Sequence, residues 1–168
     1  MANLAASINR LTEFIGNAVS WIVLALGFTV CSEVFWRFST GTSLFWAYDA
    51  TYTLCAAFFL LGASYALKYG AHIRSDFIYN ALPLATRLYI DIFGYLFLFM
   101  PLFALTFWYG LDATLSSHQS GQRSIVTRWA PPVWPLRAII PAAALLLFLQ
   151  CLSNLITSFR HLSSARNP

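Results

Sequence analysis

Residues 14–35 read FIGNAVSWIVLALGFTVCSEVF, and this stretch decides the fold. As a helix it is long enough to cross a hydrocarbon core of about 30 Å, and its only charged residue, Glu33, stands close to its end. A secretory signal would have a shorter apolar core and a cleavage site of small residues, and Glu13 beside Arg10 spoils a positively charged lead. We therefore expect residues 14–35 to form a first transmembrane helix that is retained.

Three further apolar runs of similar length predict transmembrane helices over residues 46–67, 88–109 and 136–159. Pro101 lies within the third run, where its missing N–H is expected to kink the helix. The predicted fold is therefore all-α and integral to the membrane, with four transmembrane helices in a single membrane domain over residues 1–168.

The composition supports a membrane protein. Hydrophobic residues make up 59% of the chain and charged residues 10%, whereas a soluble domain has roughly a quarter of its residues charged. The formal net charge is +4, but the basic residues stand singly at the ends of apolar runs, where they meet lipid phosphates and set topology. No basic face with a groove-reading element is visible, so we expect membrane lipids as partners and no nucleic acid.

Topology follows from the positive charges between the runs. With both termini inside, six basic residues would lie on the cytoplasmic side and four outside, which favours an N-in/C-in orientation by a modest margin. The inside set is Arg10, Lys68, Arg74, Arg87, Arg160 and Arg166, and the outside set is Arg37, Arg123, Arg128 and Arg137.

Two short patterns indicate helix-packing faces. Gly62 and Ala66 stand four apart, a spacing that lets helix backbones approach closely in lipid, although an alanine-rich, lipid-facing helix would show it by accident. Gln150 and Asn154 are one turn apart in the fourth run, and amides in lipid usually face protein. The alternative is that they are weakly constrained polar residues near a helix end.

The chain shows little that could carry chemistry. No charge lies at mid-span, and Glu33 is expected to pair with Arg37 at i+4 rather than to carry protons. The three cysteines have no metal-ligand spacing, and the three histidines stand in loops or at a span end, which disfavours a haem anchor. We expect no enzymatic activity and no catalytic, substrate-binding or metal site in this chain.

Two other classes of membrane protein remain as alternatives. A stand-alone four-helix exporter would use a carboxylate within the membrane, and Glu33 is the only candidate. A membrane anchor of a respiratory enzyme would need a histidine deep among its helices.

Several motifs are shared with one family. The chain has Arg37-Phe38 at the end of its first helix and Trp46 three positions before Asp49, and residues 61–76 read LGASYALKYGAHIRSD. Residues 128–141 read RWAPPVWPLRAIIP and lead into a leucine-rich run. Over nearly its whole length the chain resembles the small permease subunits (DctQ-type) of the TRAP transporters, the tripartite ATP-independent periplasmic uptake systems. It departs from the family at Asp49, where glutamate is common, and at Ser75, where valine is common.

The resemblance implies a bacterial inner-membrane scaffold subunit of a secondary, sodium-coupled uptake system. A large elevator-type permease subunit would carry the sodium and substrate sites, so this chain would need no cofactor. A periplasmic binding protein would deliver the solute, often an organic acid. We expect the residues that organise helix ends and the joint with the large subunit to be Arg37, Trp46, Asp49, His72, Arg74 and Asp76. We expect the residues near the docked binding protein to be Arg123, Arg128 and Trp129.

Overall fold

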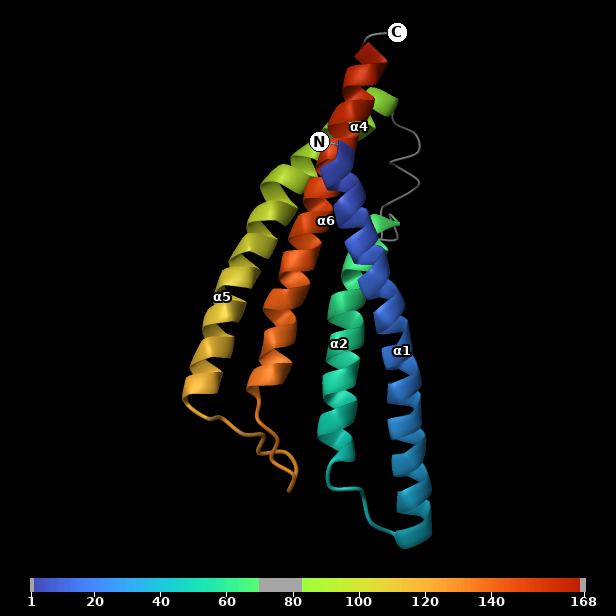
Figure 1. The fold of residues 1–168 in the computed structure, drawn as a ribbon, viewed down its shortest axis with the longest axis vertical. Coiled ribbons are helices and arrows are strands. Elements are labelled where there is room, and N and C mark those ends of the chain that lie inside the picture. Colours follow the sequence, from blue (N-terminus) through green and yellow to red (C-terminus); the bar gives the residue numbers. More distant parts are fainter. Residues whose placement is uncertain (1, 70–82, 167–168) are drawn as a thin grey trace.

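The computed structural model describes residues 2–69 and 83–166, with the backbone alone at positions 2–5, 84, 85, 87, 88 and 159–166. Its described helices are α1 (Ala2–Thr40), α2 (Ala47–Lys68), α4 (Leu84–Phe93), η1 (Gly94–Phe99), α5 (Met100–Gln119) and α6 (Trp134–Arg166). The segments α4, η1 and α5 follow one another without a break, so they form one long helix (Figure 1).

The described part of the chain contains four helices that are long and apolar enough to cross a membrane, as the sequence predicts. They are Ala6–Thr40, Ala47–Lys68, Tyr89–Gln119 and Trp134–Ser158. With its 39 residues α1 is about 58 Å long at 1.5 Å per residue, well beyond a hydrocarbon core of about 30 Å. It therefore extends outside the hydrocarbon core even when tilted.

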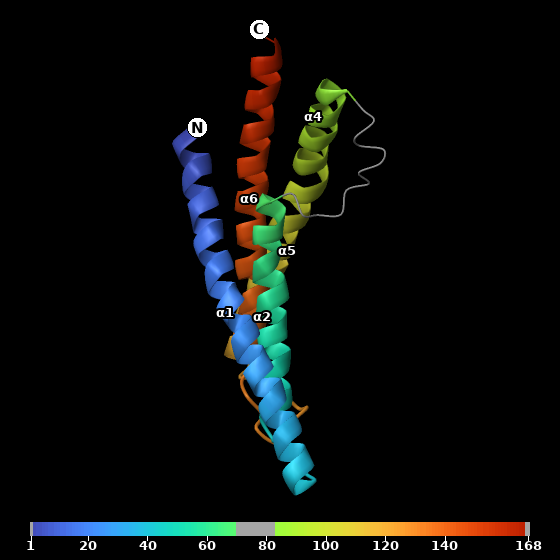
Figure 2. The same cartoon turned by 90° about the vertical axis from the view of Figure 1, so that its right-hand side faces the viewer.

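The four spanning helices form an open layer rather than a closed bundle. Seen on its broad face, the layer has the order α5, α6, α2, α1, with α5 and α1 at opposite edges (Figure 1). Near its N-terminal end α1 crosses α6 (Figure 1), and its other end follows α2 (Figure 1 and Figure 2). Within its most apolar window, 44% of α6 is buried inside the chain, against 17, 11 and 6% for the first, second and third spans. The last helix is therefore the core around which the others are arranged.

A polar network in this core joins the helices. The amide of Gln150 is fully buried; its Oε1 accepts a hydrogen bond from Thr12 Oγ1 at 2.8 Å, and its Nε2 donates to Asn9 Oδ1 at 3.1 Å. Gln150 Nε2 also donates to Asn154 Oδ1 at 3.1 Å, and Asn154 Nδ2 donates to the carbonyl of Leu67 at 3.3 Å. The predicted Gln150–Asn154 packing face is thus confirmed, and it reaches both α1 and α2.

Close packing between α1 and α2 depends on a glycine that the sequence pattern did not single out. A Cβ on Gly16 would lie 2.2 Å from Tyr65 Cδ2 and 2.8 Å from its Cγ, so the ring occupies the space that a side chain would need. The predicted Gly62 also faces α1, but there a Cβ would meet Val19 at an ordinary 3.7 Å. The tightest approach of α1 to α2 is therefore at Gly16, one turn along α1 from the Val19 side chain that meets Gly62.

The third span contains a π-helical turn next to its proline. The π-helical turn η1 ends just before Pro101, which occupies the first turn of α5. Single π-turns inside α-helices are one way to accommodate an interruption in the hydrogen-bond ladder. Further along, a Cβ on Gly110 would lie 3.2 Å from Pro141 Cδ, so α5 and α6 also pack closely there.

The first prediction concerns the contact at Gly16. Replacing Gly16 with Ala gains helix propensity but forces a methyl group into the Tyr65 ring, and overpacking costs about 1–3 kcal/mol. Gly27→Ala on the same helix is the matched control, because nothing lies within 4 Å of its added Cβ. We expect a lower free energy of unfolding in detergent for Gly16→Ala than for Gly27→Ala. Equal stability of the two variants would show that Tyr65 does not pack here.

The second prediction concerns the buried amide. Gln150→Leu removes three hydrogen bonds, which within membranes are worth about 0.6–1.7 kcal/mol each, so we expect a loss of about 2–5 kcal/mol in unfolding free energy. The control is Asn17→Leu, an amide-to-leucine change on the exposed side of α1. If both variants unfold like the unaltered protein, the network contributes nothing to stability.

Candidate functional site

Two connections lie at the same end of the helices (Figure 1). One is the short 41–46 connection between α1 and α2, and the other is the 120–133 loop between α5 and α6. Gly41 has a φ of +69° and donates its N–H to the carbonyl of Arg37 at 2.9 Å, a glycine helix stop that ends α1. We call this part of the molecule, residues 33–49 with residues 120–133, the loop end.

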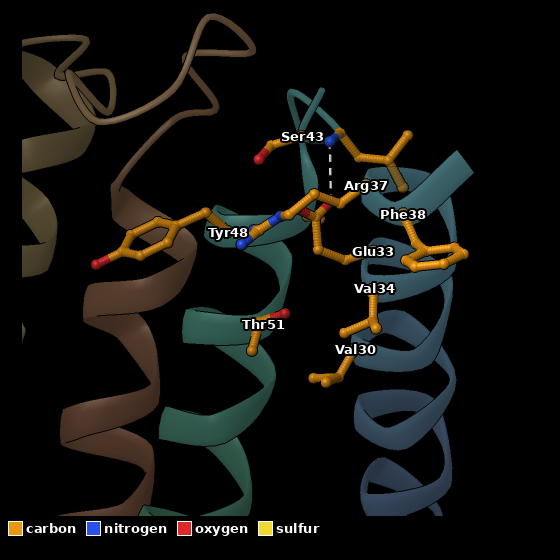
Figure 3. A pocket seen from close by; sticks show the side chains of 10 residues that line it. Val30, Glu33, Val34, Arg37, Phe38, Ser43, Tyr48 and Thr51 are labelled. Atoms are coloured by element: carbon orange, nitrogen blue, oxygen red, sulfur yellow. Dashed lines mark hydrogen bonds and ion pairs between the residues drawn. The ribbon is translucent and has the colours of Figure 1, made fainter. Parts of the chain in front are cut away.

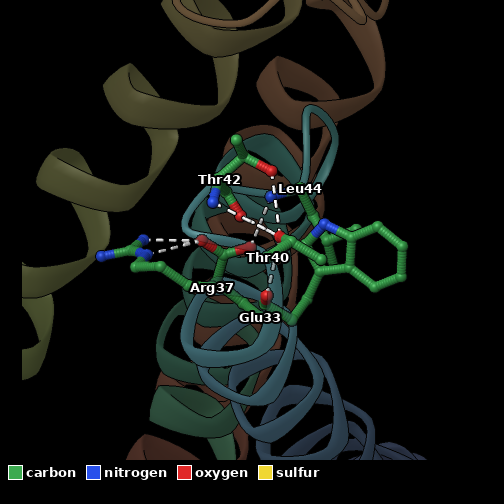
Figure 4. A network of polar contacts seen from close by, with 6 residues as sticks. Glu33, Arg37, Thr40, Thr42 and Leu44 are labelled. Atoms are coloured by element: carbon green, nitrogen blue, oxygen red, sulfur yellow. Dashed lines mark hydrogen bonds and ion pairs between the residues drawn. The ribbon is translucent and has the colours of Figure 1, made fainter.

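The carboxylate of Glu33 ties α1 to the 41–46 connection at the loop end (Figure 4). Arg37 Nη2 and Nε donate to Glu33 Oε1 at 2.6 and 3.1 Å, which confirms the predicted pairing. The second carboxylate oxygen of Glu33 accepts the backbone N–H of Leu44 at 2.8 Å. This carboxylate therefore fixes both the arginine and the chain that leads into α2.

The carboxylate of Asp49 holds the 120–133 loop against the start of α2. Asp49 is buried, and its Oδ1 accepts a hydrogen bond from Ser124 Oγ at 2.9 Å, while its Oδ2 accepts one from Thr127 Oγ1. Hydrogen bonds to a charged acceptor are stronger than neutral ones. Asp49 thus acts as a latch between two parts of the chain that are far apart in sequence.

The 120–133 loop has a hairpin-like base and an exposed tip. Ser124 N donates to the carbonyl of Pro131 at 2.9 Å, and Val133 N donates to that of Gln122 at 3.0 Å. At the tip, Ile125 is 97% exposed, and Val126 is exposed beside it. The latch and the backbone bonds therefore hold an apolar tip outward.

The predicted site residues fall into three groups. Arg37 is exposed, Trp46 is half-buried and Asp49 is buried, all at the loop end. The docking candidates are exposed on the 120–133 loop, at Arg123, Arg128 and Trp129. The remaining interface candidates, His72, Arg74 and Asp76, lie outside the described residues. The structure thus brings Asp49 and the loop of the docking candidates together, although the sequence had assigned them to different partners.

Sequence reasoning missed the groups that bind these residues. Ser124 and Thr127 carry no pattern that would mark them as donors to Asp49, because the two bonds span 75 and 78 positions. At the opposite end of the helices, Lys68 Nζ donates to Glu13 Oε2 at 3.0 Å and to the carbonyl of Asn9 at 3.1 Å. This second tie between α1 and α2 also depends on a contact remote in sequence.

Metal chemistry finds no support in the described ranges. Across residues 2–69 and 83–166, no three or more His, Cys, Asp or Glu side chains gather so as to hold a metal ion. The two carboxylates at the loop end are each engaged by donors from this chain. The loop end is therefore suited to holding elements in place and presenting a surface.

Comparison with known proteins adds two findings. The family model described as "Tripartite ATP-independent periplasmic transporters, DctQ component" matches residues 26–161. The chain is also similar to the ectoine TRAP transporter small permease protein TeaB of Halomonas elongata, with 29% identity over 148 residues that cover 85% of this chain and 74% of that relative. The matched range contains the loop end, the Gln150 amide and three of the four spans in full.

The third prediction concerns the Asp49 latch. Asp49→Asn removes the charge that strengthens two hydrogen bonds, so we expect faster amide hydrogen exchange in residues 122–130, by roughly tenfold for a loss of about 1.4 kcal/mol. Asp112→Asn, an exposed carboxylate on α5, is the matched control. Unchanged exchange of the loop in Asp49→Asn would refute the latch.

Proposed function

This chain belongs to the DctQ component family of the tripartite ATP-independent periplasmic transporters, and from that premise we propose that it scaffolds a large permease subunit in sodium-coupled solute uptake. As a member of that family it is a small permease subunit and a multi-pass protein of the inner membrane. In the proposed division of labour, the large subunit carries the sodium and substrate sites and moves as an elevator. A periplasmic binding protein delivers the solute.

The observation that carries this proposal is the family match together with the distribution of charge along the spans. The charged residues bracket each apolar stretch, as Glu13 and Glu33 do in α1 or Asp91 and Asp112 in the third span. Ionisable groups inside the membrane are the usual markers of ion pathways, and these stretches contain none. A chain of this kind supports a transport pathway formed elsewhere.

The proposed orientation is N-in/C-in. The N- and C-terminal ends lie at the same end of the described helices, as four crossings require (Figure 1). Basic residues are in excess at that end, and because such residues favour the cytoplasmic side of a membrane, we place that end in the cytoplasm. On this orientation the loop end faces the periplasm, and the end of α2 at Lys68 faces the cytoplasm.

The proposed subunit joint uses residues at both helix ends. Arg37, Trp46 and Asp49 would organise the periplasmic end, with Asp49 acting through the loop that it latches. His72, Arg74 and Asp76 would contribute from the cytoplasmic connection. Charged groups at span ends can pair with protein there without crossing the hydrocarbon core.

The proposed docking surface for the binding protein is the exposed side of the 120–133 loop. Arg123, Arg128 and Trp129 are exposed there, next to the apolar tip at Ile125 and Val126. Tryptophan and arginine are enriched in protein interfaces and their hot spots. Replacing them should alter the dependence of uptake on binding-protein concentration.

For the solute we propose an organic acid, which the family resemblance favours. The second candidate is ectoine, which the name of the Halomonas elongata relative favours. Selectivity in either case would reside in the large subunit and the binding protein. Measuring the uptake of an organic acid and of ectoine in the same reconstituted system separates the two candidates.

The fourth prediction tests the scaffold role in proteoliposomes. With the large subunit and the binding protein present, uptake should be lost when this chain is omitted and should fall sharply when sodium is replaced by potassium. Loss of uptake only on omission would leave the scaffold in place and refute sodium coupling. Full uptake without this chain would refute the scaffold.

Charge reversals test the joint. Asp49→Lys and Arg74→Glu should each lower the yield of large subunit that co-purifies with the chain. Asp49→Lys releases the loop that Asp49 latches, and Arg74→Glu reverses the charge that Arg74 would bring to the joint. Their controls are Asp112→Lys and Arg10→Glu. Unchanged complex yield and uptake for both test variants would refute this joint.

A further inference from the structure

At the loop end, α1 and α2 enclose a wedge-shaped hollow of about 740 Å³ (Figure 3). Its inner wall is apolar and is formed by Val30 and Val34 from α1 and by Ala47 from α2. Its outer rim is polar and carries Glu33 and Arg37. The hollow therefore changes from apolar to charged along the helix axis, in the same direction as a lipid leaflet does.

The arginine at the rim is positioned but not saturated. Its Nε and Nη2 donate to the same oxygen of Glu33, which orients the guanidinium plane. A guanidinium has five N–H donors, and its fork matches the oxygens of a phosphate. The Arg37 side chain is 63% exposed, against 14% for Glu33, and it extends from α1 into the hollow (Figure 3).

A second hollow, of about 400 Å³, adjoins the first. The two share Ser43, Leu44 and Tyr48 in their linings, and the second is also lined by Arg128. Among the residues that line them, the charged groups are two arginines and one carboxylate, so the combined site carries an excess of one positive charge. This excess favours an anionic ligand over a zwitterionic one.

We propose that this wedge is a binding site for an anionic phospholipid. The phosphate is held by Arg37, and an acyl chain lies along Val30 and Val34. Arginine–phosphate pairs are frequently bidentate, and the site stands at the end of a span, at the depth of the lipid headgroups. For Arg37, this assignment makes the direct contact one with lipid rather than with the large subunit.

The experiment is native mass spectrometry of the purified transporter complex with added phosphatidylglycerol or phosphatidylethanolamine. We expect the unaltered complex to retain phosphatidylglycerol in roughly tenfold preference, as one strong charged contact would give. The double variant Glu33→Gln/Arg37→Gln replaces the ion pair with an amide pair that can still link α1 to Leu44, and it should lose this preference. Arg37→Lys keeps the charge but not the fork, and should retain less lipid than the unaltered complex.

Arg10→Gln is the control, because it removes a positive charge from α1 toward the opposite end of the helix, whereas the double variant leaves the net charge unchanged. It should leave the preference unchanged; an equal loss would mean that an arginine elsewhere on α1 attracts the lipid as strongly as this site does. Full retention by the double variant would also overturn the proposal. Efficient cross-linking of the Val34→Cys variant to the large subunit would overturn it as well, since protein would then fill the wedge. Uptake does not enter these readouts, so failure here leaves the scaffold role standing.

Discussion

A glutamine amide inside an apolar helix must find its hydrogen-bond partners in protein, because the hydrocarbon core offers none. Gln150 meets this requirement by binding Thr12 and Asn9 of α1 and Asn154 of its own helix. Asn154 extends the network to the carbonyl of Leu67 at the end of α2. The hydrogen bonds that satisfy this one amide therefore hold α1, α2 and α6 together at the end of the layer where both termini lie.

Away from that network the helices are held differently. Toward the loop end α1 diverges from α6 (Figure 1). There α5 still packs closely on α6 at Gly110, and polar contacts at helix ends join the other elements. Glu33 binds the backbone of Leu44, and Asp49 binds the loop before α6. The result is an open layer, with most of the apolar surface of α1, α2 and α5 facing outward. Such a layer suits a subunit whose neighbours complete it.

The sequence was a good guide where the cause is local. Apolar length predicts the four spans, i+4 spacing predicts the Glu33–Arg37 pair, and the need of amides for partners predicts the Gln150–Asn154 face. It was a poor guide where the cause is a distant contact. Gly16 is important because of the Tyr65 ring, and Asp49 because of two hydroxyls in a remote loop. Neither relation leaves a periodic pattern, since each depends on how the helices cross.

The open arrangement is tested most directly by one distance, between the outer helices α1 and α5. After replacement of Cys31, Cys55 and Cys151, spin labels at the exposed positions Leu24 and Leu105 report this distance by pulsed electron paramagnetic resonance. With α2 and α6 between them and neighbouring helix axes 8–10 Å apart, the account predicts a separation of about 24–30 Å. A distribution centred on the spacing of adjacent packed helices would show a closed four-helix bundle and contradict it.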